Sequence, residues 1–142
     1  MKKVNTDPRQ YKILAANMTA VEFSEVSNLA RQRFHLSEHA LEKMESENIS
    51  LHAIQATVDY GQLIEVSSQP GKFILRALLR MNVRPTRGGR YICCVVVELR
   101  ADANEIVTVY RNDVGDNHDS LIEGFYRWSG SVSDKVLEIL DR

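Results

Sequence analysis

Residues 91–99 read Tyr-Ile-Cys-Cys-Val-Val-Val-Glu-Leu, a stretch in which apolar side chains occupy both alternating sets of positions. A strand that is apolar on both faces belongs in the interior of a sheet, because water would otherwise meet one of those faces. The stretch therefore predicts a central strand. Its adjacent cysteines, Cys93 and Cys94, point to opposite faces of such a strand, so we expect two buried, reduced thiols.

The segments around this stretch carry the period of two that strands show. Residues 73–82 alternate between an apolar set and a mixed set, and residues 105–111 alternate in the same way. Their connections to residues 91–99 are short, so the three strands are expected to be sequential antiparallel neighbours. A fourth, shorter strand is predicted over residues 63–66.

The N-terminal half carries the 3.6-residue period of amphipathic helices instead. Thr19 and Glu22 form a capping-box pattern, which predicts a helix that runs to about Gln32. Its apolar stripe consists of Phe23, Val26, Leu29 and Ala30.

Two further helices are predicted next along the chain. Ser37 is the expected N-cap of a helix over residues 38–47, and Asn48 is its expected C-terminal stop. Ser50 caps a third helix through Tyr60, after which Gly61 suits a left-handed helix terminus. The residues expected to face inward are Ala40, Leu41 and Met44 from one helix and Ile54, Thr57 and Val58 from the other.

Helices followed by strands indicate the α+β class, and 142 residues suit one domain. We expect two or three helices packed on one face of a four-stranded antiparallel sheet, in a single domain over residues 19–142. Residues 1–18 are expected to form an irregular arm and residues 119–142 a C-terminal helical tail. The chain has no apolar run long enough to span a bilayer, and its N-terminus turns polar at once, so a cytoplasmic protein with no membrane partner is expected.

The formal net charge of −1 hides an uneven distribution. Residues 66–97 carry six basic side chains and no acidic one, whereas residues 98–142 carry five basic and ten acidic side chains. A basic segment of this kind is either the footprint of a nucleic acid or a solvated surface balanced by acidic neighbours in space.

Strand parity gathers side chains suited to phosphodiester chemistry on one sheet face. If Val107 and Val109 pack against the helices, the alternate residues of that strand face away from the helices; these are Ile106, Thr108 and Tyr110. The same alternation places Arg76 and Arg80 on this outward face. Arginine pairs with phosphate oxygens, and tyrosine can orient a hydroxyl, stack on a base or transfer a proton. An ordinary wet sheet face is the alternative interpretation.

The histidines provide one candidate acid or base but no metal site. His39 is the candidate, because the imidazole side chain is suited to proton transfer as an acid or a base. His35 and His39 have the i, i+4 spacing of helical metal ligands, but Ser37 as N-cap leaves His35 outside the helix, so no metal is expected. The sequence has no glycine-rich phosphate loop either, and no cofactor is expected.

Three segments together resemble a known family. They are Ser-Glu-His-Ala-Leu-Glu-Lys-Met at residues 37–44, Tyr-Gly-Gln-Leu-Ile-Glu at 60–65, and Ile-Val-Thr-Val-Tyr-Arg at 106–111. Together they are similar to the bacterial domain-of-unknown-function 4258 family over about residues 34–112. That family is grouped with the barnase/EndoU/colicin/RelE superfamily of small RNases and toxins. The resemblance implies two helices on one face of a four-stranded antiparallel sheet.

The resemblance also implies a site. Carried over position by position, it points to His39, Lys43, Arg76, Thr108, Tyr110 and Arg111, with Lys43 at a position where the family usually has arginine. With Arg80 added by strand parity, the expected catalytic residues are His39, Arg76, Thr108 and Tyr110, and the expected substrate-binding residues are Lys43, Arg80 and Arg111.

The implied function is that of a metal-independent endoribonuclease or toxin-like domain acting on RNA. In that mechanism His39 or Tyr110 handles protons, while Arg76 and Arg80 stabilise the charge on the phosphorus centre. Two alternatives stay open, a non-catalytic RNA- or protein-binding module of the same fold, and an immunity-type or regulatory partner whose acidic ends contact a basic protein. The expected partners are accordingly RNA or a cognate antitoxin or immunity protein.

Overall fold

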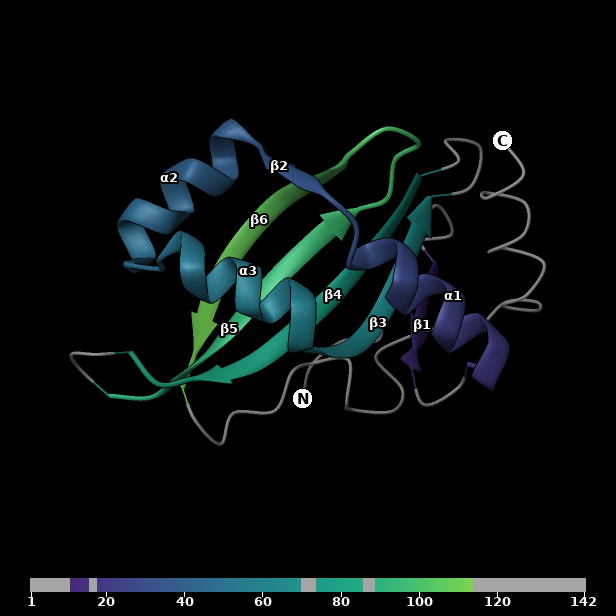
Figure 1. Ribbon diagram of the computed structural model, residues 1–142, viewed down its shortest axis with the longest axis horizontal. Helices are drawn as coiled ribbons and strands as arrows, with labels where there is room; N and C mark the ends of the chain where they lie inside the picture. Colours follow the sequence, from purple (N-terminus) through teal and green to yellow (C-terminus); the bar gives the residue numbers. More distant parts are fainter. Residues whose placement is uncertain (1–10, 16–17, 70–73, 86–88, 114–142) are drawn as a thin grey trace.

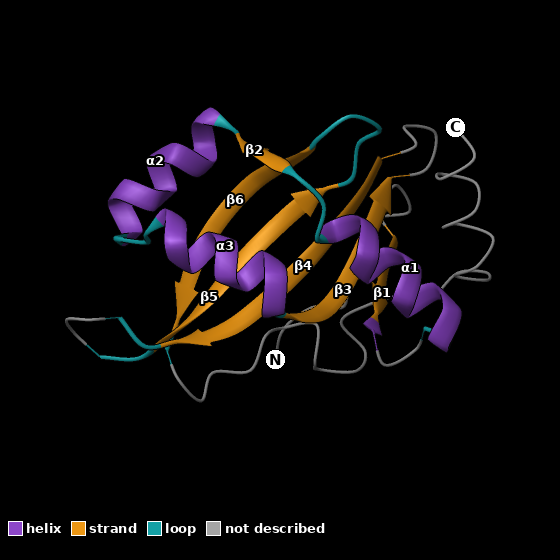
Figure 2. Ribbon diagram, in the orientation of Figure 1, coloured by secondary structure: helices purple, strands orange, loops and turns teal. Residues whose placement is uncertain are grey.

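The computed structural model describes residues 11–15, 18–69, 74–85 and 89–113. In this part of the chain, three helices lie on one face of a six-stranded sheet (Figures 1 and 2). The expected α+β class is confirmed. The expected sheet of four antiparallel strands is too small, because two short strands from the N-terminal third extend it at both edges and one of them runs parallel to its neighbour.

The sheet has the strand order β1-β3-β4-β5-β6-β2. Its four long strands are successive antiparallel neighbours, as predicted, and β5 lies in the interior of the sheet. The strands span Tyr11–Leu14 (β1), Phe34–Leu36 (β2), Gln62–Gln69 (β3), Ile74–Val83 (β4), Tyr91–Glu98 (β5) and Asn104–Asn112 (β6).

Both edge strands fall where irregular chain was expected. The irregular arm predicted over residues 1–18 is wrong at residues 11–14, because β1 pairs there with β3. β2 lies between the first two helices and pairs in parallel with β6 over residues 104–106. Strands of three or four residues are too short to show a period, so their pairing depends on contacts that are distant in sequence.

The helices begin and end as their capping residues predict. They span Ala20–Ala30 (α1), Glu38–Glu47 (α2) and Leu51–Tyr60 (α3). Thr19 and Glu22 make both hydrogen bonds of the capping box, and the hydroxyls of Ser37 and Ser50 accept from the backbone N–H groups of Ala40 and Ala53. Asn48 ends α2 with a left-handed backbone, φ 54°.

Gly61 follows α3 for a different reason from the one predicted. Its backbone is extended, with φ −65° and ψ 159°, and the left-handed terminus expected there is absent. A Cβ atom at this position would lie 2.3 Å from the carbonyl oxygen of Thr57 and 3.2 Å from that of Arg80. Glycine is needed here mainly because the carbonyl of Thr57 in the last turn of α3 lies too close for a side chain, and the carbonyl of Arg80 in β4 adds to the crowding.

The main core lies between the helices and the sheet. Val26 and Ala30 of α1, and Ile54, Thr57 and Val58 of α3, are fully buried there, as predicted. Phe23, which belongs to the same predicted stripe of α1, is 39% exposed, so the prediction is wrong there. The inward face predicted for α2 is right for Ala40 and Met44 but wrong for Leu41, which is 51% exposed. The strands contribute alternate residues to this core: Leu63, Val66, Leu75, Ala77, Leu79, Tyr91, Cys93, Val95, Val97, Ile106 and Val109.

A bulge in the β5–β6 pair changes the expected parity of β6. Val96 pairs with Thr108 and Val97 with Ile106, so Val107 has no partner on β5. Ile106 consequently points into the main core, whereas strict alternation places it beside Thr108 on the other face. Beyond the bulge the predicted parity holds. The predicted helical tail at residues 119–142 lies outside the described residues, as does Phe73 of the predicted strand at 73–82.

Candidate functional site

The face of the sheet opposite the three helices, called the second face below, carries four of the seven predicted site residues. Arg80, Cys94 and Tyr110 form one transverse row across β4, β5 and β6. Leu78, Val96 and Thr108 form the next row, and Arg76, Glu98 and Glu105 the row after that. Arg76, Arg80, Thr108 and Tyr110 therefore share a face, as strand parity predicted.

The second face is not simply the wet surface of a sheet. Ile64, Leu78 and Cys94 form a small buried cluster on it, against which Ile92, Val96 and Tyr110 pack. Its polar groups lie around this apolar centre. Tyr110 is therefore held by packing as well as by hydrogen bonds.

One cluster of polar side chains on this face contains residues from each of the strands β3 to β6. Arg80 and Tyr110 both hydrogen-bond with the sulfur of Cys94, which is fully buried beneath them. Burial raises the pKa of the Tyr110 phenol, and the nearby carboxylate of Glu65 raises it further, so the phenol is protonated at neutral pH. Burial likewise raises the pKa of the Cys94 thiol, which disfavours a nucleophilic thiolate.

The second cluster of polar side chains is a chain of ion pairs and hydrogen bonds that crosses four strands. Oε1 of Glu98 accepts from Nε of Arg76 at 3.1 Å, and Oε2 of Glu98 accepts from Nε of Arg100 at 2.8 Å. Arg100 also reaches Glu105 at 3.3 Å, and Nε2 of His35 lies 3.0 Å from the other oxygen of Glu105. The order is thus Arg76–Glu98–Arg100–Glu105–His35, from β4 to β2.

Burial differs sharply along this chain. The side chain of Glu98 is 9% exposed, whereas those of Arg76 and Arg100 are 43% and 45% exposed. Burial alone raises the pKa of Glu98, but the N–H groups of Arg100 and Arg76 outweigh it and hold that pKa below its ordinary value. Glu98 is therefore a fixed negative charge between two accessible arginines.

The other three predicted residues lie on the side of the sheet that the helices cover. His39 is exposed on the first turn of α2, and no described hydrogen bond or ion pair joins it to the second face. Lys43 pairs with Glu47 along α2 at 3.2 Å. Arg111 donates to the backbone carbonyl of Glu47 at 3.1 Å and stacks 3.8 Å above the ring of Tyr91.

The sheet therefore separates the expected site into two groups. Arg111 stabilises the C-terminal end of α2, where a cation interacts favourably with unpaired carbonyls. Its predicted role in binding, like those of His39 and Lys43, stays a prediction. A single site that contains both His39 and Tyr110 does not form in this arrangement.

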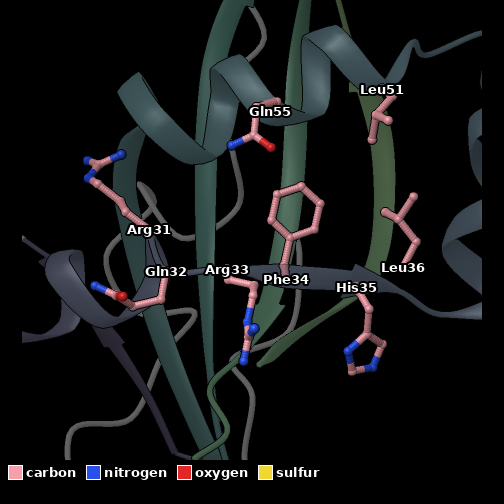
Figure 3. Close-up of a pocket in the computed structure, with 8 residues that line it drawn as sticks. All are labelled: Arg31, Gln32, Arg33, Phe34, His35, Leu36, Leu51 and Gln55. Carbon is pink, nitrogen blue, oxygen red and sulfur yellow. The ribbon is translucent and has the colours of Figure 1, made fainter. Parts of the chain in front are cut away.

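A groove of about 480 Å³ lies between β2 and α3. Phe34 and Leu36 point toward α3, where Leu51 and Gln55 face them, as Figure 3 shows. Arg31 lies at one end of the groove, but its guanidinium already donates to the carbonyls of Val58 and Gly61 at 2.8 Å. Polar and apolar side chains thus line the groove to a similar extent, and the guanidinium of Arg31 serves to hold the end of α3.

Sequence reasoning missed the residues that give the second face its charge pattern. Glu65, Glu98, Arg100, Glu105 and His35 come from four strands and one turn, and only the register brings them together. The sequence did show that residues 66–97 carry only basic charges. For Arg76, the alternative interpretation that acidic neighbours balance this charge in space holds. No group of three or more potential metal ligands occurs among the described residues.

Comparison with protein families matches residues 36–111 to a family described as Domain of unknown function (DUF4258). No curated protein matches the chain. No solved structure matches it either. None of the described helices is both long and apolar enough to cross a membrane.

Proposed function

The chain belongs to the DUF4258 family, and from this membership and the geometry of the second face we propose that it is an RNA-binding domain. The proposal includes the grouping of this fold with the barnase/EndoU/colicin/RelE-like RNases and toxins. RNA would lie across β4, β5 and β6, on the face that carries Arg76 and Arg80. The matched region contains α2, α3, β3, β4 and β5 and nearly all of β6.

The observation that carries this proposal is the register of the three central strands. It places Arg76, Arg80, Thr108 and Tyr110 on one face, away from the helices. Arginine side chains match phosphate oxygens, and a tyrosine ring offers a surface for a base. Binding through such contacts is sensitive to salt, because each phosphate contact releases condensed counterions.

The test is to titrate the purified protein with a fluorescent single-stranded RNA at several salt concentrations. Arg76→Ala and Arg80→Ala should each weaken binding and reduce the slope of log K against log salt by about 0.7. Arg33→Ala is the matched control, because it removes an exposed arginine whose described hydrogen bond reaches only the carbonyl of Asp102. Equal effects of all three variants, or no binding by the wild type at low salt, would contradict the proposal.

Lys43→Ala tests where RNA binds. Lys43 lies on α2, on the other side of the sheet from Arg76. Binding at the second face leaves the Lys43 variant with the affinity of the wild type. A larger loss with Lys43→Ala than with Arg76→Ala would instead place RNA on the helix side, together with His39 and Arg111.

Cleavage of RNA is the second candidate, favoured by the closeness of Glu65, Arg80 and Tyr110 on the second face. Glu65 would take the proton of a 2′-hydroxyl as it attacks the adjacent phosphorus. Arg80 would stabilise the charge that develops on the phosphate oxygens, and the protonated Tyr110 would donate to the departing 5′-oxygen. The products would be a 2′,3′-cyclic phosphate and a free 5′-hydroxyl.

Cleavage is tested with the same RNA in the presence of EDTA. Glu65→Gln and Tyr110→Phe should each slow cleavage by roughly 10²–10⁴-fold. His39→Ala should leave the rate unchanged, because His39 lies on α2. Binding without cleavage would select the non-catalytic module, and the absence of both would favour a protein partner.

A further inference from the structure

Glu98 and the two arginines beside it form a compact unit on the second face. Its carboxylate lies between Arg76 and Arg100 and receives the Nε edge of both guanidinium groups. Phosphate and carboxylate oxygens are recognised by arginine through the same paired N–H geometry. The carboxylate of Glu98 therefore stands where one bound phosphate group would interact best.

We propose that Glu98 is a built-in competitor that makes the second face selective for polyanionic chains over single phosphates. This inference rests on the proposed RNA binding and names how that same site chooses its ligand.

The competition is uneven because Glu98 is part of the protein. A tethered group acts at a high effective concentration, commonly in the millimolar range or above. The side chain of Glu98 is only 9% exposed and is fixed by both arginines, so it does not leave the site easily. A free phosphate ion or mononucleotide must compete with it for N–H groups and gains little.

A polyanionic chain avoids this competition. Arg76 and Arg100 are close to half exposed, so N–H groups that do not face Glu98 are accessible to a ligand. A chain can place successive phosphates on Arg76, Arg100 and Arg80 at once. Several weak contacts within one ligand then add, as in any multivalent interaction.

Glu105 acts in the same way but more weakly. Of the two arginines, Glu105 contacts only Arg100, at 3.3 Å, and the side chain of Glu105 is 24% exposed. The charges that face Glu98 and Glu105 are those of Arg76, Arg100 and, when protonated, His35. Glu105 therefore provides an independent and milder test of the same idea.

The experiment compares the wild type with Glu98→Gln, which keeps the shape of the side chain and removes its charge. Inorganic phosphate is titrated by calorimetry at constant ionic strength, and single-stranded RNA by fluorescence anisotropy across a salt series. The wild type should give no phosphate binding in the millimolar range, whereas Glu98→Gln should give measurable binding. The variant should also bind RNA several-fold more tightly, with a salt slope about 0.7 steeper.

Glu42→Gln is the matched control, because it makes the same change in net charge at an exposed position of α2. It should resemble the wild type in both titrations. An equal gain from Glu42→Gln and Glu98→Gln would overturn the proposal, since general charge would explain it. Unchanged phosphate and RNA binding by a folded Glu98→Gln protein would overturn it as well.

Glu105→Gln keeps the test decisive if Glu98→Gln does not fold. It should shift both titrations in the same direction as Glu98→Gln but by less, and no shift with Glu105→Gln would then count against the proposal. The phosphate titration needs no RNA, so the experiment can contradict the competitor role of Glu98 and the proposed RNA binding independently. Wild-type RNA binding without a gain in the variants removes only the competitor, whereas phosphate binding by Glu98→Gln without any RNA binding removes only the proposed function.

Discussion

Gly61 occupies a position in which the surrounding backbone leaves no room for a side chain. The carbonyl oxygens of Thr57 and Arg80 lie within 3.2 Å of the point where a Cβ would be. A glycine after a helix most often indicates a left-handed residue, and here Asn48 has that role at the end of α2. The sequence alone cannot tell whether a glycine after a helix is needed for a left-handed backbone or for its lack of a side chain. The three-dimensional surroundings of Gly61 show that the lack of a side chain is what matters here.

Gly61→Ala is therefore expected to lower the free energy of unfolding by about 1–3 kcal/mol, the usual range for overpacking. Gly89→Ala is the control, because a Cβ there meets nothing within 4 Å. Urea denaturation of both variants measures the difference. Similar stabilities for the two variants would show that the contact at Gly61 relaxes without cost.

At the scale of elements, the helices and long strands follow from local rules and the edge strands do not. Ser37, Ser50 and Asn48 mark helix ends because their side chains or backbones satisfy groups within a few residues. β1 and β2 are defined by pairing with β3 and β6, which lie far along the chain. The shift of Ile106 into the core has the same cause, since a bulge is a property of two strands together.

Ser37 takes part both in a local helix cap and in a contact with a strand that is distant in sequence. Its hydroxyl accepts from the N–H of Ala40 at 3.0 Å and donates to the carbonyl of Val107, the bulged residue of β6, at 2.9 Å. Ser50 caps α3 in the same way, with its described hydroxyl contact limited to the N–H of Ala53. Ser37 thus holds α2 to the sheet edge as well as capping it.

Ser37→Ala should consequently cost more stability than Ser50→Ala. Loss of an N-cap costs about 1 kcal/mol, and the additional hydrogen bond to Val107 contributes about 0.5–1.5 kcal/mol more. Chemical denaturation of the two variants, compared with the wild type, gives both values. A Ser50 variant that is equally or more destabilised would contradict the special role of Ser37.

At the scale of the whole molecule, the sequence predicted one half of the candidate site well. Alternation within a strand correctly grouped Arg76 and Arg80, and Thr108 with Tyr110 beyond the bulge. The same prediction placed the helix that carries His39 on the other face of the sheet, so the combined site implied by the family resemblance already conflicted with strand parity. Alternation could not show that Glu98 meets Arg76, because residues 76 and 98 become neighbours only through the β4–β5 register.

The buried cysteine of the main core makes the stability of the whole fold sensitive to alkaline pH. Burial raises the pKa of the Cys93 thiol from its ordinary value near 9 to about 11, although a hydrogen bond with Thr57 opposes the shift. Between these values the unfolded chain has released a proton that the folded protein retains. The free energy of unfolding must therefore fall as pH rises above about 9.

Cys93→Ala should show a shallower decline than the wild type over this range, by up to about 1.4 kcal/mol per pH unit. Urea denaturation at pH 7, 9 and 10.5 measures it, with the variant's own value at pH 7 as its reference. The remaining slope comes from Cys94, Tyr91 and Tyr110, whose pKa values are also raised by burial. Parallel curves for wild type and variant would refute the assignment to Cys93.

The parallel pairing of β2 with β6 has a consequence for how the protein is made. About 70 residues separate Leu36 from its partner Ile106. At a synthesis rate of about 5–20 residues per second, the ribosome needs roughly 4–14 s to produce the second strand after the first. Throughout that interval Phe34 and Leu36 lack the strand with which β2 pairs in the folded protein. Every newly made copy therefore completes this edge of its sheet only after β6 has been synthesised.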